Sequence, residues 1–137
     1  MSYALSAVLV VVPISVAVIA IIALFGQRSL GRHRGVSREE FVNAFSEGDI
    51  PLAIPAAVFD YYKSQVWSKE FSVAPDDDYE HVLSASEEDI DDDAHFLIKS
   101  LGFKIPPNYA AVRSETCIRT LRDMVRWLHW VQQQQLG

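Results

Sequence analysis

Two runs of aspartate, Asp76–Asp78 and Asp91–Asp93, each lie close in sequence to a histidine, His81 and His95. Carboxylate oxygens and imidazole nitrogens are metal ligands, so metal binding is the first chemistry to consider. A calcium-binding EF-hand loop needs alternating acids, a glycine and a distant glutamate, and neither run has the glycine or the alternation. A structural zinc site needs closely spaced cysteines or histidines, whereas Cys117 is the single cysteine. We therefore predict no metal site, and interpret the runs as a solvated acidic loop and the charged start of a helix.

Hydrolytic catalysis is the second chemistry that the residue types allow. Ser84, His81 and the surrounding acids include the components of a nucleophilic triad. However, no nucleophile-elbow motif surrounds Ser84 or Ser86, and the sequence has no glycine-rich phosphate loop. We predict that the chain has no catalytic residue and is not an enzyme.

Charge is distributed unevenly along the chain. The 137 residues include 18 Asp and Glu against 12 Lys and Arg, and the formal net charge is −6. From Glu70 to Asp93 there are eleven acids and no Lys or Arg. Nucleic-acid binding is excluded because phosphate contacts require basic surface. We expect the acidic stretch to bind a protein partner that has a basic patch. The predicted partner-binding residues are Glu87, Glu88, Asp89, Asp91, Asp92 and Asp93.

Helix-capping signals predict four helices and no sheet. Capping-box patterns begin at Ser37 and Thr120, and Ser86 is an N-cap residue followed by three acids. The expected helices cover residues 37 to about 48, 51 or 55 to 67, 86 to 102, and 120 onward. Their predicted apolar faces include Phe41 and Phe45; Ile54, Val58, Tyr61 and Tyr62; Ile90, Ala94, Leu97, Ile98 and Leu101; and Leu121, Met124, Val125, Leu128 and Val131. Tyr61, Tyr62, Trp67, Trp127 and Trp130 are interpreted as core and rim residues rather than as a ligand cage.

Residues 7–25 contain no charged side chain, and 13 of them are Val, Ile, Leu or Phe. As a helix this stretch is about 28 Å long, close to the ~30 Å hydrocarbon core of a bilayer. A signal peptide fits less well because no basic residue precedes the apolar run and the run is too long. A buried core helix is also disfavoured, because so small a domain could not cover it on all sides. We predict a transmembrane anchor over residues 1–27.

Arg28, Arg32 and Arg34 follow the expected anchor, whereas no basic side chain precedes it. The positive-inside rule then places the N-terminus outside and the C-terminal domain in the cytoplasm, as in a single-pass protein of the inner or plasma membrane. Residues 28–36 are expected to form a basic linker beside the lipid bilayer, with the three arginines flanking the membrane. Residues 37–134 are expected to form an acidic, helical cytoplasmic domain.

The order of motifs over residues 52–131 resembles that of acyl-carrier-protein-like domains. Such domains have a long first helix, a long acidic loop, an acidic second helix ending near a Phe-x-x-x-Ile-Pro stretch, and a last helix beginning Thr-Val-x-Asp-Leu-Val. The corresponding stretches here are Phe71-Ser-Val-Ala-Pro-Asp76, the segment from Asp89 to Gly102, Phe103-Lys-Ile-Pro106 and Thr120-Leu-Arg-Asp-Met-Val125. The resemblance implies an all-α fold: an N-terminal transmembrane helix plus a small four-helix, carrier-like bundle.

The resemblance also indicates where a prosthetic group would be attached. The family carries phosphopantetheine on the serine of an Asp-Ser-Leu motif at the start of the second helix, but this chain reads Asp89-Ile-Asp-Asp-Asp93 there. Ser84 and Ser86 lie a few residues upstream and are followed by residues that do not match the motif. The implied protein is a divergent carrier-like domain without a cofactor, whose acidic helix retains partner recognition.

Three functions follow from these observations. The leading hypothesis is a membrane-anchored, non-enzymatic interaction module that presents the acidic helix to a partner protein. The first alternative is a working membrane-tethered acyl or peptidyl carrier modified at Ser84 or Ser86. The second alternative is a structural subunit of a membrane complex.

Overall fold

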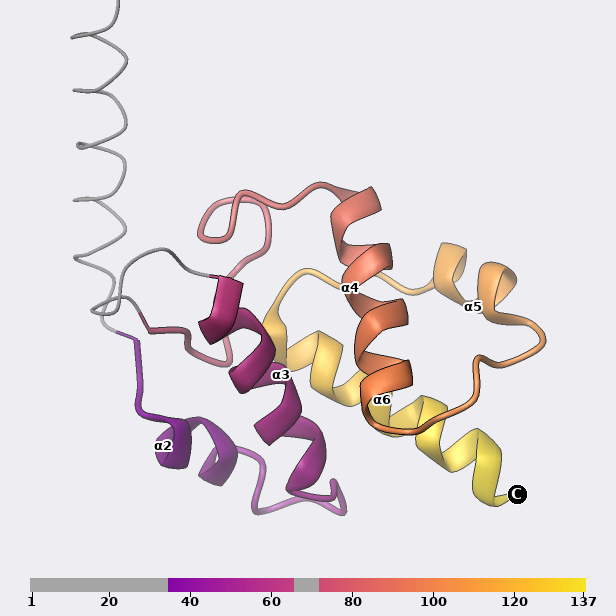
Figure 1. Cartoon of the computed structure of the whole chain (residues 1–137), viewed down its shortest axis with the longest axis horizontal. Helices are drawn as coiled ribbons and strands as arrows, with labels where there is room; N and C mark the ends of the chain where they lie inside the picture. The colour runs from indigo at the N-terminus through magenta and orange to yellow at the C-terminus, as the bar shows by residue number, and fades with distance from the viewer. Residues whose placement is uncertain (1–34, 66–71) are drawn as a thin grey trace, which may run out of the picture. The chain divides into compact units, whose positions relative to one another are not determined.

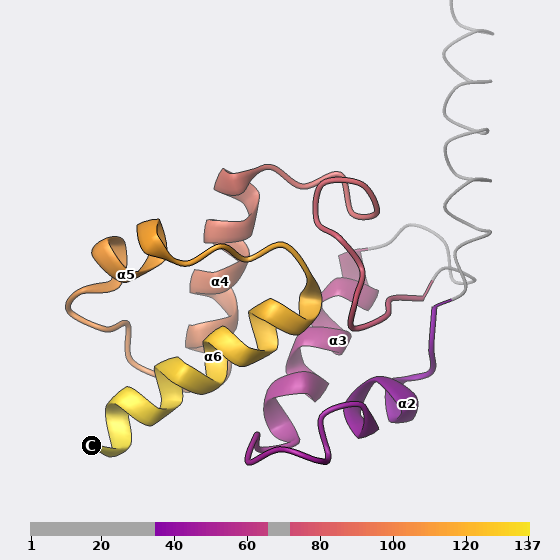
Figure 2. The same cartoon turned by 180° about the vertical axis from the view of Figure 1, so that it is seen from behind.

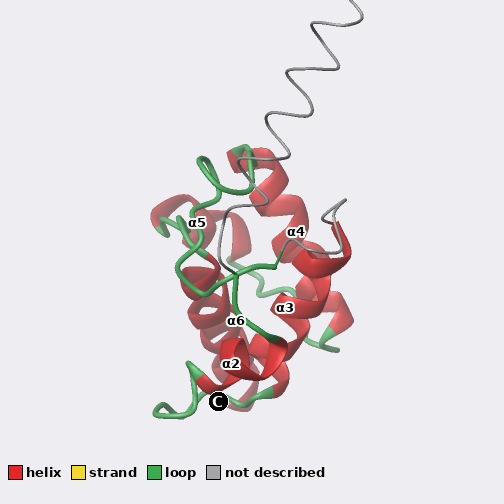
Figure 3. Cartoon of the chain, turned by 90° about the vertical axis from the view of Figure 1, so that its left-hand side faces the viewer, coloured by secondary structure: helices red, strands yellow, loops and turns green. Residues whose placement is uncertain are grey.

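The computed structural model describes residues 35–65 and 72–137 (Figure 1). These residues form the helices α2 (Arg38–Asn43), α3 (Ala53–Gln65), α4 (Glu87–Ser100), α5 (Tyr109–Glu115) and α6 (Leu121–Leu136). The described part contains no strand (Figure 3), so the prediction of an all-α domain is confirmed. In the same residues, no helix combines the length and apolar character needed to cross a membrane. The expected anchor at 7–25, with Arg28, Arg32 and Arg34, lies outside the described residues.

The starts of three helices are fixed by the capping residues that the sequence indicates. Ser37, Ser86 and Thr120 each accept a hydrogen bond from the backbone N–H three residues later. The acid at that later position reaches back to the backbone N–H of the capping residue in all three cases. Each pair therefore satisfies two donors that a helix start otherwise leaves unpaired.

The core lies where α3, α4 and α6 meet. Helix α6 contacts both α3 and α4, and α2 packs against α3. Figure 1 has α3 and α4 in front of α6, and Figure 2 shows the reverse arrangement from behind. The predicted apolar positions that are buried are Phe41, Phe45, Ile54, Val58, Tyr62, Ile90, Ala94, Leu97, Ile98, Leu121, Met124, Val125, Leu128 and Val131. Burial of this shared apolar surface is the main stabilising contribution to the domain.

The number and lengths of the helices differ from the prediction. The described residues contain five helices rather than four, because the seven-residue helix α5 forms between α4 and α6. Its N-cap residue, Asn108, makes no side-chain capping bond, so the usual start signal is absent. The first predicted helix is also shorter than expected. It ends at Asn43, and turns follow as far as Glu47.

The loop before α4 is folded onto the start of α6 and is less solvated than predicted. The Tyr79 N–H donates to the Arg119 carbonyl at 2.9 Å, and the Arg122 N–H donates to the Pro75 carbonyl at 2.7 Å. Arg122 also binds the Asp76 carboxylate through two hydrogen bonds of 2.6 and 3.0 Å. Asp77 is only 3% exposed, and its carboxylate accepts the Ala74 N–H at 2.7 Å.

The end of the predicted linker belongs to the folded domain. Val36 packs against the core, and its carbonyl accepts the Ser72 hydroxyl. A Cβ atom at Gly35 would lie 2.3 Å from the Ser72 carbonyl carbon and oxygen, a separation that atoms cannot adopt. Glycine at this position therefore permits the close approach of the two backbones.

Candidate functional site

Helix α4 carries all six of the predicted partner-binding acids, and the structure gives them different surroundings. Asp93 faces α3, where the Tyr61 and Tyr62 hydroxyls donate to its two carboxylate oxygens at 2.5 and 2.7 Å. The Tyr79 hydroxyl donates to the Tyr62 hydroxyl at 2.7 Å and extends the chain of hydrogen bonds. Asp93 therefore joins α3, α4 and the loop between them.

Burial governs the ionisation of these tyrosines. Desolvation is the largest cause that raises the pKa of Tyr62 and of Tyr79 far above the ordinary value for tyrosine. Desolvation, followed by the hydrogen bond to Asp93, likewise raises the pKa of Tyr61. All three phenols are therefore neutral at physiological pH, and act as hydrogen-bond donors rather than as general bases.

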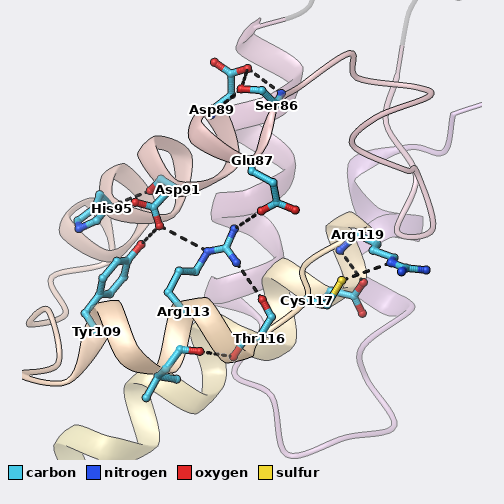
Figure 4. Close-up of polar contacts among 12 residues, drawn as sticks. Ser86, Glu87, Asp89, Asp91, His95, Tyr109, Arg113, Thr116, Cys117 and Arg119 are labelled. Atoms are coloured by element: carbon cyan, nitrogen blue, oxygen red, sulfur yellow. Dashed lines mark hydrogen bonds and ion pairs between the residues drawn. The ribbon is translucent and has the colours of Figure 1, made fainter.

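Glu87 and Asp91 face α5 (Figure 4). The Arg113 guanidinium lies between them, with its Nη2 atom 3.2 Å from Glu87 Oε2 and its Nε atom 3.5 Å from Asp91 Oδ1. The Tyr109 hydroxyl donates to Asp91 Oδ1 at 2.7 Å. Both acids are therefore engaged in holding α5 against α4, and a partner would have to compete with Arg113 for them.

Asp89 stabilises the start of its own helix. Its Oδ2 atom accepts the backbone N–H and the hydroxyl of Ser86, each at 2.7 Å (Figure 4). The hydrogen bond from the Ser86 side chain is the largest cause that holds the pKa of Asp89 below its usual value. This carboxylate is exposed, but its hydrogen-bonding capacity is partly used by the capping box.

Glu88 and Asp92 are exposed and, unlike the other four acids of α4, take no part in the capping and side-chain contacts described above. They lie four residues apart, and Phe96 lies four residues further along. Residues at this spacing share one face of a helix. Phe96 is 55% exposed and is the one phenylalanine among the described residues that lies at the surface to this extent. We define the solvent-facing row Glu88, Asp92 and Phe96 as the α4 stripe.

A shallow groove of about 570 Å³ lies beside the end of the α4 stripe. Its lining includes Ala57, Tyr61 and Ser64 of α3 and Phe96, Leu97 and Ser100 of α4. The Phe96 ring packs against the Tyr61 ring with centroids 4.9 Å apart. Because Asp93 holds the Tyr61 hydroxyl, this wall of the groove is fixed in place.

Ser84 and Ser86, the two predicted attachment serines, are both exposed. Ser86 is the N-cap residue of α4, and its hydroxyl both accepts from the Asp89 N–H and donates to the Asp89 carboxylate. Ser84 has φ +53°, and is the one residue other than glycine with a positive φ in the described chain. Modification of Ser86 would therefore break the cap, whereas Ser84 is free of such a role.

The histidines considered as metal ligands lie in separate surroundings. His81 contacts Asp78 at 2.9 Å, a hydrogen bond that raises the pKa of the histidine. The His95 Nδ1 atom lies 3.0 Å from the Asp91 carbonyl oxygen, and its ring stacks near Tyr109. Within the part of the chain that the structure describes, no group of three or more His, Cys, Asp or Glu is placed to hold a metal ion.

A second hollow, of about 400 Å³, lies between the end of α5 and α6. Trp127 and Trp130 line it together with Arg126, Asp123 and Cys117. Trp127 is buried and Trp130 half-buried, as expected for core and rim residues, while Trp67 lies outside the described residues. The exposed Cys117 thiol accepts a hydrogen bond from Arg119 at 3.3 Å (Figure 4).

Sequence reasoning missed Phe96 and Arg113. The exposure of Phe96 could have been predicted from the sequence, because this residue falls outside the apolar positions that define the buried face of α4. The pairing of Arg113 had no local signal, because its partner Glu87 lies 26 residues earlier. No family model, curated protein or solved structure matches this chain.

Proposed function

We propose that the chain is a membrane-anchored, non-enzymatic, carrier-like interaction module. It presents the outer face of α4 to a partner protein with a basic patch. The observation that carries this proposal is the division of roles among the acids of α4. Four of them contribute to capping or to contacts inside the domain, even though Glu87 and Asp89 are also exposed, whereas Glu88 and Asp92 are exposed on one face and make no such contact. Exposed carboxylates at this spacing attract a basic partner and orient its approach.

The order of the helices supports the carrier-like part of the proposal. Helix α3 is long, the loop that follows is acidic, and α4 carries acids through its first half. After α4 come the turn from Phe103 to Pro106 and, later, the Thr120 cap of α6. These are the positions at which the sequence resembles acyl-carrier-protein-like domains.

The proposed location is the inner or plasma membrane, with residues 7–25 as a single span and the acidic domain in the cytoplasm. The apolar run and the arginines after it support this topology. Alkaline extraction should leave the full chain with the membranes and release a variant that lacks residues 1–27. Protease added to sealed, right-side-out cells should leave the domain intact. Release of the full chain by alkali would contradict the anchor.

Charge reversal at the two exposed acids tests partner binding. Cross-linking in intact membranes should recover a partner with the natural chain and lose it with Glu88→Lys/Asp92→Lys. The matched control is Glu47→Lys/Asp49→Lys, which changes the net charge equally at exposed acids outside α4. Recovery of the same partners with both double variants would contradict the proposal. Asp91 and Asp93 are unsuitable for this test because they hold the fold together.

The alternative function is a working membrane-tethered carrier modified at Ser84 or Ser86, since both serines are exposed beside the start of the acidic helix. Ser86 lies at the start of the acidic helix and is exposed, as an attachment serine must be. Incubation of the full chain with a phosphopantetheinyl transferase and coenzyme A, followed by intact-mass measurement, distinguishes the two functions. A gain of one phosphopantetheine that Ser84→Ala or Ser86→Ala abolishes would establish the carrier. An unchanged mass would exclude it.

A further inference from the structure

The groove between α3 and α4 is lined by Phe96, the last residue of the α4 stripe. The stripe therefore ends at a surface that is largely apolar. Tyr61 and Phe96 form its aromatic wall, and their ring centroids lie 4.9 Å apart. Asp92 and Glu88 lie about one and two turns along α4 from Phe96, or roughly 6 and 12 Å at the rise of an α-helix. An occupant of the groove that follows α4 therefore meets first an apolar surface and then two carboxylates in line.

We infer that the groove accepts a large apolar side chain from a basic amphipathic helix of the partner. Lys or Arg residues one and two turns away on that helix would pair with Asp92 and Glu88. This inference rests on the proposed function and specifies the chemistry of its partner. A helix laid along another helix offers side chains at the required spacing, because both repeat every three to four residues.

Charge complementarity favours this occupant over two others. A second copy of the chain carries the same formal net charge of −6, so its approach to this acidic surface would be opposed by like charge. An anionic bilayer surface would likewise repel the two carboxylates. A basic helix pairs with both acids and buries the exposed Phe96 ring, an aromatic anchor of the type that dominates binding energy at interfaces.

Site-specific photo-cross-linking tests this inference in the full chain. A benzophenone amino acid at position 96 is activated in native membranes, and the attached peptide is identified by mass spectrometry. We expect attachment to another protein, in a helical segment with Lys or Arg three to four and seven to eight residues from the attached position. The adduct should fall at least about tenfold with Glu88→Lys/Asp92→Lys, since charge pairing is required. The same photoreactive residue at the exposed Ala110 should not yield this adduct.

Several outcomes would overturn the inference. These are attachment within the same chain, to a second copy or to lipid, attachment to a segment without basic residues, and the absence of any adduct at position 96. Ser64→Trp provides a second test, because it fills the groove from an exposed position and should reduce the adduct from a photoreactive residue at position 100, another exposed lining position, tenfold or more.

A comparison of variants separates the inference from the proposed function. Phe96→Ser removes the apolar anchor; losing the ring contact with Tyr61 should lower the free energy of unfolding by about 1 kcal/mol and leave the domain folded. If Glu88→Lys/Asp92→Lys abolishes partner recovery and Phe96→Ser leaves it unchanged, the groove inference fails and the proposed function stands. If neither variant changes recovery, both fail. Loss of recovery with each variant supports both.

Discussion

Asp93 and its neighbour Asp92 have the same side chain and opposite roles. The Asp93 carboxylate accepts two tyrosine hydroxyls, one of which receives a hydrogen bond from Tyr79. Asp92 is exposed to solvent. Consecutive residues of a helix point about 100° apart, so a run of three aspartates necessarily serves more than one surface. Composition alone therefore identifies an acidic helix without identifying which acids a partner can reach.

Removal of the Asp93 carboxylate should destabilise the domain. In Asp93→Ala the Tyr62 hydroxyl, on a side chain that is 5% exposed, loses its acceptor. We expect the free energy of unfolding to fall by about 2–3 kcal/mol, because a buried donor is left unsatisfied. Asp92→Ala, the matched control, should change it by less than about 0.5 kcal/mol. Urea denaturation followed by circular dichroism measures both, and equal effects would contradict the assigned role of Asp93.

The buried tyrosines predict a loss of stability at alkaline pH. Their pKa values are raised in the folded domain, whereas unfolded tyrosine titrates near pH ~10. Above that pH the unfolded chain releases protons that the folded chain retains, so the free energy of unfolding falls as pH rises. Below about pH 10 the tyrosines contribute no such slope.

Tyr79→Phe provides the comparison for this pH dependence. It removes one of the buried titrating hydroxyls, so the decline above about pH 10 should be shallower than in the natural chain. Urea denaturation at a series of pH values measures the two slopes. A variant slope as steep as that of the natural chain would show that Tyr79 does not contribute.

Among the elements, α5 is held mainly by its side chains. Tyr109 and Arg113 reach Asp91 and Glu87 on α4, and the Tyr109 ring packs edge-on against Trp127 at 5.6 Å. In the described chain, the backbone of no other helix lies close to that of α5. Its stability therefore depends on a few polar contacts more than that of α3, α4 or α6.

Arg113→Gln should loosen α5 while leaving the rest of the bundle folded. The substitution removes the ion pairs with Glu87 and Asp91, and the hydrogen bond to the Thr116 carbonyl is weakened. We expect amide hydrogen exchange in α5 to accelerate about five- to tenfold, a local loss of about 1 kcal/mol. Exchange in α6 should be unchanged. Glu115→Gln, at an exposed position of the same helix, is the control, and equal acceleration in both variants would contradict the assigned role of Arg113.

Local signals explain which elements could be predicted from the sequence. The caps at Ser37, Ser86 and Thr120 depend on residues three positions apart, and the apolar faces repeat over four to eight positions, so both are visible in sequence. Helix α5 lacks a side-chain cap, and its attachment depends on residues of α4. The Asp93 network and the groove likewise join residues about 30 positions apart, and such pairings follow from packing rather than from any local pattern.

At the scale of the whole domain, the first described residues, Gly35 and Val36, contact Ser72 in the segment after α3. Gly35→Ala would place a Cβ atom against the Ser72 carbonyl, so residues 35 and 36 would have to move away. We expect a loss of about 1–2 kcal/mol in the free energy of unfolding, because the Val36 contact with the core is weakened. Thermal or urea denaturation of the full chain in detergent measures the change.

Gly48→Ala is the control for this substitution. The nearest atom to a Cβ at Gly48 lies 3.9 Å away, an ordinary contact, and this glycine has no positive φ. Alanine should therefore be neutral, or stabilise slightly by restricting the unfolded chain. A Gly35→Ala variant as stable as Gly48→Ala would show that residues 35 and 36 contribute little to the fold.

The close approach at Gly35 also limits the reach of the domain. Nine residues, 26–34, separate it from the end of the proposed membrane span at residue 25, and an extended chain of this length spans at most about 30 Å. On the proposed topology, a partner in the same membrane would be confined with the α4 stripe to a thin layer beside the bilayer, so the two proteins would meet more often than if both were free in solution. A weak interaction would then be sufficient in the membrane, whereas dilution into detergent would separate the two proteins.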